Sequence, residues 1–433
     1  MSISEIYNLY LSHPLIFIDT RKITEGCLFF ALKGENFDGN TFADQAIEKG
    51  ATYVVIDDPK FKKNDRYILV DDTLIALQEL AKHHRKQLKI PVIGLTGSNG
   101  KTTTKELINA VLSQKFKALA TKGNLNNHIG VPLTLLEIIP ETEIAIIEMG
   151  ANHQKEIEML SEICQPQYGL ITNVGKAHLE GFGGFEGVKK GKGELYDFLQ
   201  NHDGTVFINK DNAFLTEMAN SRKFKKTIYY GRDGSSEVKG ELLNNDPFLE
   251  INWTYRNQQF QVLSNLTGTY NFENILVAIA IGLEFGLAAH EINKGIRDYE
   301  PQNNRSQIIK TENNTVIGDY YNANPSSMPV ALENMASLKA KKKVVILGDM
   351  FEVGDSSALE HDAVLQQALS YQFDQVILIG EEFFNINELA DEAIFYRTTS
   401  DAIIELKKNP IKDALVLLKG SRGMKLESLM ELL

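Results

Sequence analysis

An apolar run that enters a glycine-rich loop and then Gly-Lys-Thr is the feature that most constrains the fold of this chain. The run extends from Val92 to Thr96, and the loop continues as Gly97-Ser98-Asn99-Gly100-Lys101-Thr102-Thr103. Glycines allow backbone N–H groups to approach phosphate oxygens, and the N-terminus of a following helix faces their negative charge. The Lys101 amine would reach the outer phosphates, and the Thr102 hydroxyl could bind Mg²⁺. The segment therefore predicts a buried strand, a phosphate-binding loop and a helix in succession.

The glycine spacing of this loop differs from that of the ordinary P-loop. Leu95 stands where the pattern requires a glycine five residues before Gly100, and the nearest glycines are Gly94 and Gly97. The alternative interpretation is a glycine-rich turn between a strand and a helix that carries a surface lysine. Because Gly-Lys-Thr lies between a strand pattern and a helix pattern, the segment favours nucleotide binding.

The length of 433 residues exceeds what one hydrophobic core usually supports, so several domains are expected. The first region carries short apolar runs at 54–56 and 68–70, and apolar residues at three- and four-residue spacing predict a helix over 73–88. Ile90-Pro91 then marks a boundary. The predicted domains are residues 1–88, which would bind a UDP-sugar, 89–300, which would bind ATP, and 301–433, which would bind an incoming dipeptide.

The strands of the second region are predicted to form a parallel sheet, because the runs 144–147 and 169–172 are continuously apolar. The third region alternates apolar runs with helix-length segments, which predicts a second doubly wound domain. The predicted fold class is α/β in three domains: a small N-terminal α/β domain, a central P-loop-type ATPase domain with a mainly parallel sheet, and a C-terminal Rossmann-like domain. A substrate cleft between domains follows, since sites favour domain interfaces.

Composition excludes several classes of protein. The net charge of −12 argues against a protein that binds nucleic acid over a broad face. Cys27 and Cys164 are too far apart in the sequence to form a metal-binding pair, so a reduced cytoplasmic location is expected. Residues 1–5 do not begin a signal peptide. The longest apolar stretch, 275–283, is too short for a membrane span and predicts a buried helix.

Polar residues follow two predicted strands of the second region. Glu148 comes directly after one strand, and Asn173 begins the segment Asn173-Val174-Gly175-Lys176-Ala177-His178 after the other. Ligands gather at the carboxyl ends of parallel strands, so Glu148 is a candidate ligand of Mg²⁺. It could equally favour the dipole of a following helix. His178 could bind a metal or a phosphate, although a single histidine is more often structural.

Two further segments have an ordinary and a chemical interpretation. The run Lys189-Lys190-Gly191-Lys192-Gly193-Glu194 is typical of a solvated, charged surface. A lysine whose amine is kept neutral by burial could instead react with CO₂ to give a carbamate, an anion that binds metal. Asn271 and Asn274 could hydrogen-bond a purine ring, but capping of the following helix is the default interpretation.

Together and in this order, these segments closely resemble the Mur ligase family, the ATP-dependent amide-forming enzymes of peptidoglycan precursor synthesis. The resemblance covers essentially the whole chain, and the family's ATP loop explains the shortened spacing of residues 96–102. Two positions depart from the pattern: Asn40 stands where many members have histidine, and Gly318 where an aspartate often precedes Asp319. The other segments that carry the resemblance are Asp19-Thr20-Arg21, residues 34–40, 121–127, 148–152, 319–325, 347–354 and 419–423.

The resemblance implies roles for individual residues. One Mg²⁺ would be held by Thr102 and Glu148, and a second by His178 and a carbamylated Lys192. The catalytic set would be Lys101, Glu148, His178 and Lys192. The residues that would bind ATP are Gly97, Ser98, Asn99, Gly100, Lys101, Thr102, Thr103, Asn271, Arg305 and Asp319. Those that would bind the other substrates are Asp19, Thr20, Arg21, Asn126, Asn127, Asn322 and Asn324.

Among the members of the family, the segments are most similar to those of the ligase that joins D-alanyl-D-alanine to UDP-N-acetylmuramoyl-tripeptide. The resemblance implies an acyl-phosphate intermediate, release of ADP and phosphate, these two small molecules as partners, and a monomer.

Four alternatives belong to other classes or substrates: another Mur-type ligase, a folylpolyglutamate-type amide ligase, a P-loop NTPase without an acceptor, and a nucleotide-sensing scaffold. Leu95 counts against the NTPase. The Asn-Ala-Asn-Pro segment at 322–325 counts against the folylpolyglutamate type. A scaffold would not need Glu148, His178 and Lys192.

Overall fold

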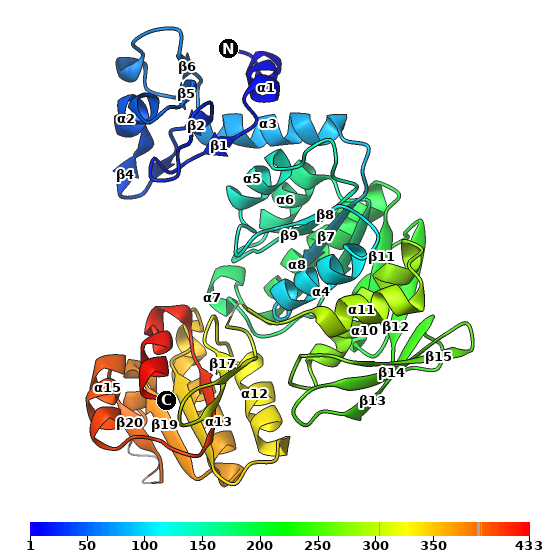
Figure 1. Cartoon of the computed structure of the whole chain (residues 1–433), viewed down its shortest axis with the longest axis vertical. Helices are drawn as coiled ribbons and strands as arrows, with labels where there is room; N and C mark the ends of the chain where they lie inside the picture. Colours follow the sequence, from blue (N-terminus) through cyan, green and yellow to red (C-terminus); the bar gives the residue numbers. More distant parts are fainter. Residues whose placement is uncertain (303, 388–389, 391) are drawn as a thin grey trace.

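The computed structural model describes residues 1–302, 304–387, 390 and 392–433. Within these residues the chain forms sheets of four, nine and six strands and one small two-stranded sheet, with helices packed on both faces of the larger sheets (Figure 1). The predicted α/β class with mainly parallel sheets is confirmed. In the same part of the chain, no helix is both long and apolar enough to cross a membrane.

The N-terminal sheet is parallel throughout, with the strand order β1-β2-β5-β6. A short antiparallel pair, β3 with β4, extends from it. The elements of this region are α1 (Ile3–Ser12), β1 (Ile16–Phe17), β2 (Leu28–Phe30), β3 (Lys33–Gly34), β4 (Phe37–Asp38), η1 (Gly39–Phe42), α2 (Ala43–Glu48), β5 (Tyr53–Ile56), η2 (Pro59–Phe61), β6 (Tyr67–Leu69) and α3 (Thr73–Gln87).

Helix α3 joins the N-terminal sheet to the central one. It begins after Asp72, whose side chain accepts a hydrogen bond of 2.8 Å from the backbone N–H of Ile75, as expected of an N-cap. Leu77 and Leu80 on its apolar face are fully buried, and the helix packs against α1, α5 and α6 (Figure 1). One continuous apolar core therefore contains residues of both the N-terminal and the central sheet.

The central sheet has the order β15-β14-β13-β12-β11-β10-β7-β9-β8 and is parallel from β13 to β8. Its elements are β7 (Val92–Thr96), α4 (Lys101–Leu112), β8 (Ala118–Ala120), α5 (Gly130–Leu136), β9 (Ile144–Glu148), α6 (Glu156–Cys164), β10 (Tyr168–Ile171), α7 (Leu179–Phe182), α8 (Phe185–Asn201), β11 (Thr205–Asn209), α9 (Ala213–Asn220), β12 (Lys226–Gly231), β13 (Val238–Asn244), β14 (Glu250–Tyr255), β15 (Gln258–Leu263), α10 (Asn271–Glu284) and α11 (Ala289–Asp298).

Strands β10, β7 and β9 lie side by side at the middle of this sheet, and β7 and β9 are buried along their whole length. Their continuous apolar runs reflect helices on both faces of the sheet. Since all three strands are parallel, the residues that follow them meet at one edge. The predicted buried helix over 275–283 is confirmed as part of α10.

The antiparallel strands β13, β14 and β15 extend the central sheet on the side away from β8. Sequence analysis did not identify them. Their signal is the alternation of buried and exposed side chains, for example in β14, where Ile251 and Trp253 are buried and their neighbours are partly exposed.

The C-terminal sheet has the order β16-β17-β21-β18-β19-β20, with β16 antiparallel and the others parallel. Its elements are β16 (Gln307–Lys310), β17 (Thr315–Asp319), α12 (Ser327–Ser337), β18 (Lys343–Gly348), η3 (Gly354–Ser356), α13 (Ser357–Ser370), β19 (Gln375–Ile379), α14 (Glu381–Phe384), β20 (Ile394–Tyr396), α15 (Thr399–Lys408), β21 (Leu415–Lys419), η5 (Arg422–Met424) and η6 (Leu426–Leu432).

The C-terminal sheet has apolar cores of its own on its two faces, and their described members all lie after residue 307. Its contacts with the central sheet near the loop 97–103 are polar. Asn324 donates a hydrogen bond of 2.8 Å to Asn99, and Lys176 forms an ion pair of 2.5 Å with Glu360. Polar interfaces between domains permit relative motion more readily than a shared apolar core does.

Candidate active site

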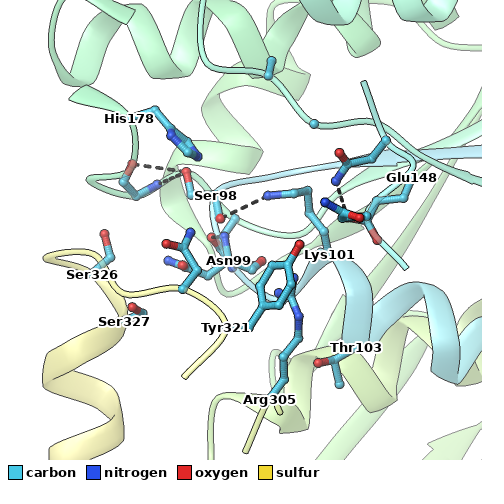
Figure 2. A pocket seen from close by; sticks show the side chains of 18 of the residues that line it. Ser98, Asn99, Lys101, Thr103, Glu148, His178, Arg305, Tyr321, Ser326 and Ser327 are labelled. Atoms are coloured by element: carbon cyan, nitrogen blue, oxygen red, sulfur yellow. Dashed lines mark hydrogen bonds between the residues drawn. The ribbon is translucent and has the colours of Figure 1, made fainter. Parts of the chain in front are cut away.

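A cavity of about 760 Å³ lies between the central and C-terminal sheets. Several of its lining residues, among them Glu148, Asn173 and Asp319, lie at or just after the carboxyl ends of strands, and Figure 2 shows side chains from the central and C-terminal parts of the chain around it. From the central part of the chain the lining includes Ser98, Asn99, Gly100, Lys101, Thr103, Asn126, Asn127, Glu148, Asn173, His178, Asn271 and Asn274. From the C-terminal part it includes Arg305, Ser306, Asp319, Tyr321, Asn322, Ser326, Glu352 and Lys419.

The glycines of the loop between β7 and α4 are required by close approach and by backbone conformation. Gly97 has φ +145°, and a Cβ atom there would lie 2.0 Å from the Thr172 Oγ1 atom. Gly100, with φ +77°, precedes α4 in the left-handed conformation that favours glycine. The predicted order of strand, loop and helix is confirmed, and the N-terminus of α4 faces the cavity.

The segment after β10 supports this loop through several hydrogen bonds. The Asn173 side chain accepts from the Asn99 N–H at 2.9 Å and donates to the Asn99 carbonyl at 3.0 Å. The Ser98 hydroxyl accepts from the Gly175 N–H at 2.9 Å. These hydrogen bonds stabilise the conformation of the loop.

Lys101 curls back over its own loop and donates to the carbonyl oxygens of Gly97 at 2.7 Å and Ser98 at 3.2 Å (Figure 2). Burial lowers the pKa of Lys101 to about 8, Glu148 opposes that shift, and the nearby Arg305 adds to it. The surroundings of Lys101 disfavour the cationic form of its amine. An anion bound in the cavity would compensate that positive charge.

Glu148 is the last residue of β9 and is almost completely buried. Its Oε1 atom accepts from Asn126 at 2.8 Å and from Thr102 at 3.2 Å. Its Oε2 atom is buried without a hydrogen-bond partner among the described residues. The next helix, α6, begins only at Glu156, so the alternative role of Glu148 at a helix N-terminus is wrong.

His178 precedes α7 with φ +53°, and its imidazole contacts the carboxylate of Glu352 from the C-terminal part of the chain. Burial lowers the pKa of His178, whereas Glu352 opposes that shift. The positive charges of Lys101 and Lys192 also lower the pKa of His178.

Lys192 lies in α8 with only 1% of its surface exposed, whereas its neighbour Lys190 is exposed. The interpretation of the whole run as a solvated surface is therefore wrong at Lys192. Burial, followed by repulsion from Lys101, holds the pKa of Lys192 well below its usual range. Its amine donates to the Ala151 carbonyl at 3.2 Å and lies 5.0 Å from the centre of the Phe182 ring.

Glu194, two residues further along α8, connects this helix to α6. Its carboxylate accepts from the backbone N–H groups of Lys155 at 2.6 Å and Glu158 at 3.0 Å, at the start of α6. The Lys-Gly-Glu segment thus contains one buried amine beside the Ala151 carbonyl and one carboxylate that fixes the start of the neighbouring helix α6.

Asn271 is the first residue of α10 but does not cap it, so the default interpretation is wrong. Its side chain donates to the Thr267 carbonyl at 2.8 Å and accepts from Asn274 at 2.8 Å. Asn274 in turn accepts from Thr104 of α4 at 2.9 Å. This network connects α10 to α4, the helix that follows the glycine-rich loop.

The C-terminal sheet contributes charged and aromatic side chains to the other side of the cavity. Asp319 and Lys419 end the neighbouring strands β17 and β21 and form an ion pair of 2.5 Å. The Arg305 guanidinium lies 4.1 Å from the centre of the Tyr321 ring, and that of Arg422 lies 5.3 Å from it. The Arg305 Nε atom is buried without a hydrogen-bond partner among the described residues.

The structure brings most of the predicted site residues together around this cavity. Gly97, Thr102 and Lys192 are not among its lining residues, and Asp19, Thr20 and Arg21 lie in the N-terminal region, outside it. Asp19 and Arg21 form an exposed ion pair of 2.7 Å. Asn322 lines the cavity, while Asn324 binds Asn99 at its edge.

At the two positions that depart from the family pattern, the structure shows what the residue present does within the chain. Asn40 is completely buried and uses its amide to bind Asp38 and Asp57, each at 2.7 Å. Gly318 leaves room for Tyr320, whose ring would lie 2.9 Å from a Cβ atom at that position.

Sequence analysis missed Tyr321, Glu352 and Lys419 as cavity residues. Lys419 ends a strand, as Glu148 does, so the same argument from strand ends would have identified it. Glu352 follows β18 by four residues, in a segment already noted for its resemblance to the family.

Three family models match successive segments of this chain. The family model described as "Mur ligase middle domain" matches residues 95–282, "Mur ligase, glutamate ligase domain" matches 304–422, and "Mur ligase family, catalytic domain" matches 14–85. The UDP-N-acetylmuramoyl-tripeptide–D-alanyl-D-alanine ligase of Bacillus subtilis is 36% identical, over 95% of this chain and 91% of the relative. The Escherichia coli ligase of that name is 35% identical, over 96% and 92%.

Solved structures of similar proteins have the same fold as this chain. The chain superposes on MurF from Acinetobacter baumannii with a TM-score of 0.85 and 32% identity, covering 96% of this chain and 92% of that one. MurF from Thermotoga maritima, solved in complex with ADP, gives a TM-score of 0.86 at 24% identity, covering 98% and 97%, and supports the fold.

Proposed function

This chain belongs to the Mur ligase family, and we propose that it joins D-alanyl-D-alanine to UDP-N-acetylmuramoyl-tripeptide in peptidoglycan precursor synthesis, with cleavage of ATP to ADP and phosphate. The observation that carries this proposal is the similarity to two curated ligases of that name, which extends over the three larger sheets. The position of the phosphate-binding loop at the base of the cavity supports it.

We assign the ATP phosphates to the loop 97–103. The N-terminus of α4 suits an anion, and an anion bound there would compensate the charge of the Lys101 amine, whose pKa is lowered by burial. Asn271 from α10 and Arg305 and Asp319 from the C-terminal part would contact the rest of the nucleotide. All three side chains line the same cavity.

The residues around Glu148 fit one Mg²⁺. The buried Oε2 atom of Glu148 has a free lone pair, and the Thr102 hydroxyl lies 3.2 Å from Oε1. A carboxylate and a hydroxyl are oxygen ligands, which this hard cation prefers. Bound there, the ion would neutralise charge on the nucleotide phosphates.

A second cation at His178 and Lys192 depends on modification of the lysine, because an amine and an imidazole do not suit Mg²⁺. No group of three or more histidine, cysteine or acidic side chains arranged for a metal occurs in the described part of the chain. A carbamate on Lys192 would supply the missing oxygens. The burial that keeps its amine neutral supports such a reaction with CO₂.

The chemistry follows from the poor reactivity of a carboxylate, which repels nucleophiles and would have to expel oxide. Transfer of the γ-phosphoryl group to the tripeptide carboxylate gives an acyl phosphate with phosphate as leaving group. The amine of D-alanyl-D-alanine attacks the acyl carbon, and the tetrahedral intermediate collapses to the amide. The task of the protein is positioning and charge neutralisation, here by Lys101 at the phosphates.

We assign the nucleotide of the UDP-substrate to Asp19, Thr20 and Arg21, and its muramyl part to Asn126 and Asn127. The N-terminal region shares its core with the central one, so it would hold the substrate in a fixed position. The C-terminal region, joined through polar contacts, would move to complete the site.

The decisive experiment measures phosphate release and amide formation by the purified protein, with each substrate omitted in turn. We expect release to require ATP, UDP-N-acetylmuramoyl-tripeptide and D-alanyl-D-alanine together. Matched reactions should contain glutamate with a folate acceptor, or a free diamino acid with a UDP-muramyl-dipeptide. Turnover with either of these pairs, or equal ATP hydrolysis without an acceptor, would contradict the proposal.

A further inference from the structure

Among the residues that the structure describes, four carboxylates line the cavity, and they differ in their hydrogen-bond partners. Glu148 accepts from Asn126 and Thr102, and Asp319 pairs with Lys419. Glu156 accepts from the N–H groups of Asn152 at 2.6 Å and His153 at 3.0 Å. These three therefore have partners within their own part of the chain.

Glu352 is the fourth, and its contact crosses between the two sheets. Its side chain is 54% exposed, and among the described residues its hydrogen bond is to the imidazole of His178. It thus presents an accessible carboxylate beside His178, which is proposed to hold the second cation.

The backbone that carries Glu352 is held in an unfavourable conformation by its surroundings. Glu352 has φ +60°, the left-handed region that non-glycine residues rarely adopt. The residues before it are fixed: the Met350 N–H donates to His361 at 3.0 Å, and the Phe351 N–H donates to Ser421 at 3.0 Å. Strain of this kind persists where the surrounding structure enforces it, and it is concentrated at functional sites.

We propose that Glu352 binds the ammonium group of D-alanyl-D-alanine, an inference that rests on the proposed function. An ammonium group is a donor with a full positive charge, and its natural partner is an accessible carboxylate. Because Glu352 touches His178, an amine held by it would lie next to a residue proposed to hold the second cation.

If Glu352 only held the central and C-terminal parts of the chain together, its substitution would have the same effect as removal of another ion pair at that interface. The Lys176–Glu360 ion pair crosses the same interface, and Glu360 does not line the cavity. Glu360→Gln therefore removes an interfacial charge without touching the cavity, and it serves as the matched control for Glu352→Gln.

The test compares two acceptor-site ligands in the full-length enzyme with saturating ATP and UDP-N-acetylmuramoyl-tripeptide. One is D-alanyl-D-alanine, measured by its KM, and the other is D-lactyl-D-alanine, measured as a competitive inhibitor, in which a hydroxyl replaces the ammonium. We expect Glu352→Gln to raise the KM of D-alanyl-D-alanine by about 10- to 100-fold, since a charge-assisted hydrogen bond is lost. Inhibition by D-lactyl-D-alanine should change little, and Glu352→Asp should retain part of the preference for the ammonium.

Equal weakening of both ligands in Glu352→Gln, an unchanged KM, or the same effect in Glu360→Gln would overturn the inference. A failure of the proposed function is distinguishable, because the wild-type enzyme would then form no amide with D-alanyl-D-alanine at all.

Discussion

The amine of Lys192 donates a hydrogen bond to the backbone oxygen of Ala151 at 3.2 Å, although the side chain lies almost completely within the protein. A carbonyl oxygen does not compensate a buried positive charge as a carboxylate would, and the pKa of Lys192 is held well below its usual range. A neutral amine is the form that reacts with CO₂.

Lys192→Ala should therefore abolish phosphate release, and short carboxylic acids such as acetate should partly restore it by supplying the missing anion. Lys192→Arg should be inactive with or without acetate, because the guanidinium stays protonated and cannot become an anionic ligand. The exposed neighbour provides the control: Lys190→Ala should behave as the wild type. Full activity of Lys192→Ala, with unmodified electron density at the Nζ atom in an ATP-bound crystal, would refute the carbamate.

Lys101→Ala should lower kcat by about 100- to 1,000-fold, as expected when one group that stabilises developing charge is removed. The thermal unfolding temperature should not fall, because removal of a buried amine with a lowered pKa relieves desolvation. Lys122→Ala removes an exposed lysine paired with Glu137 and should leave turnover unchanged. Wild-type turnover in Lys101→Ala would show that the loop 97–103 does not bind the reacting phosphates.

Glu148→Gln should weaken the effect of Mg²⁺ on nucleotide binding. In the wild type, we expect Mg²⁺ to strengthen the binding of ADP measured by calorimetry, and a chelator to reverse this. In the variant, the Mg²⁺ concentration needed to strengthen ADP binding should rise by at least about tenfold, because a neutral amide replaces a carboxylate ligand. An identical Mg²⁺ requirement in both proteins would remove Glu148 from the metal site.

Tyr321 is expected to position Arg305, whose guanidinium lies 4.1 Å from the ring centre. Tyr321→Leu should raise the KM for ATP by about 3- to 30-fold through loss of a cation–π contact, and leave the KM for D-alanyl-D-alanine unchanged. Tyr321→Phe keeps the ring and should restore the wild-type value. If Tyr321→Phe raises the KM for ATP as much as Tyr321→Leu does, ATP binding depends on the hydroxyl rather than on the ring, and the stacking role is wrong. Tyr320→Phe, which removes only a hydrogen bond to Asn304, is the neighbouring control.

Several features of the fold could be predicted because they depend on residues close together in the sequence. The strand at Val92–Thr96, the glycines of the loop and the helix that begins at Lys101 form one local unit. The position of Glu148 at a strand end also follows from a short apolar run. The antiparallel strands β13 to β15 were missed because their alternating pattern is weak and their pairing joins the edge of a larger sheet.

The sequence by itself determined the glycine-rich loop between a strand and a helix, the α/β class and the strand ends at which polar side chains gather, since these follow from local backbone preferences and apolar periodicity. Only the tertiary structure decided which of the lysines in 189–192 is buried, because the inward face of α8 is set by its packing against α6 and α7. It also decided the contact between His178 and Glu352, which are separated by 174 residues. Such a contact depends on how two separately folded sheets meet, and no local pattern encodes that arrangement.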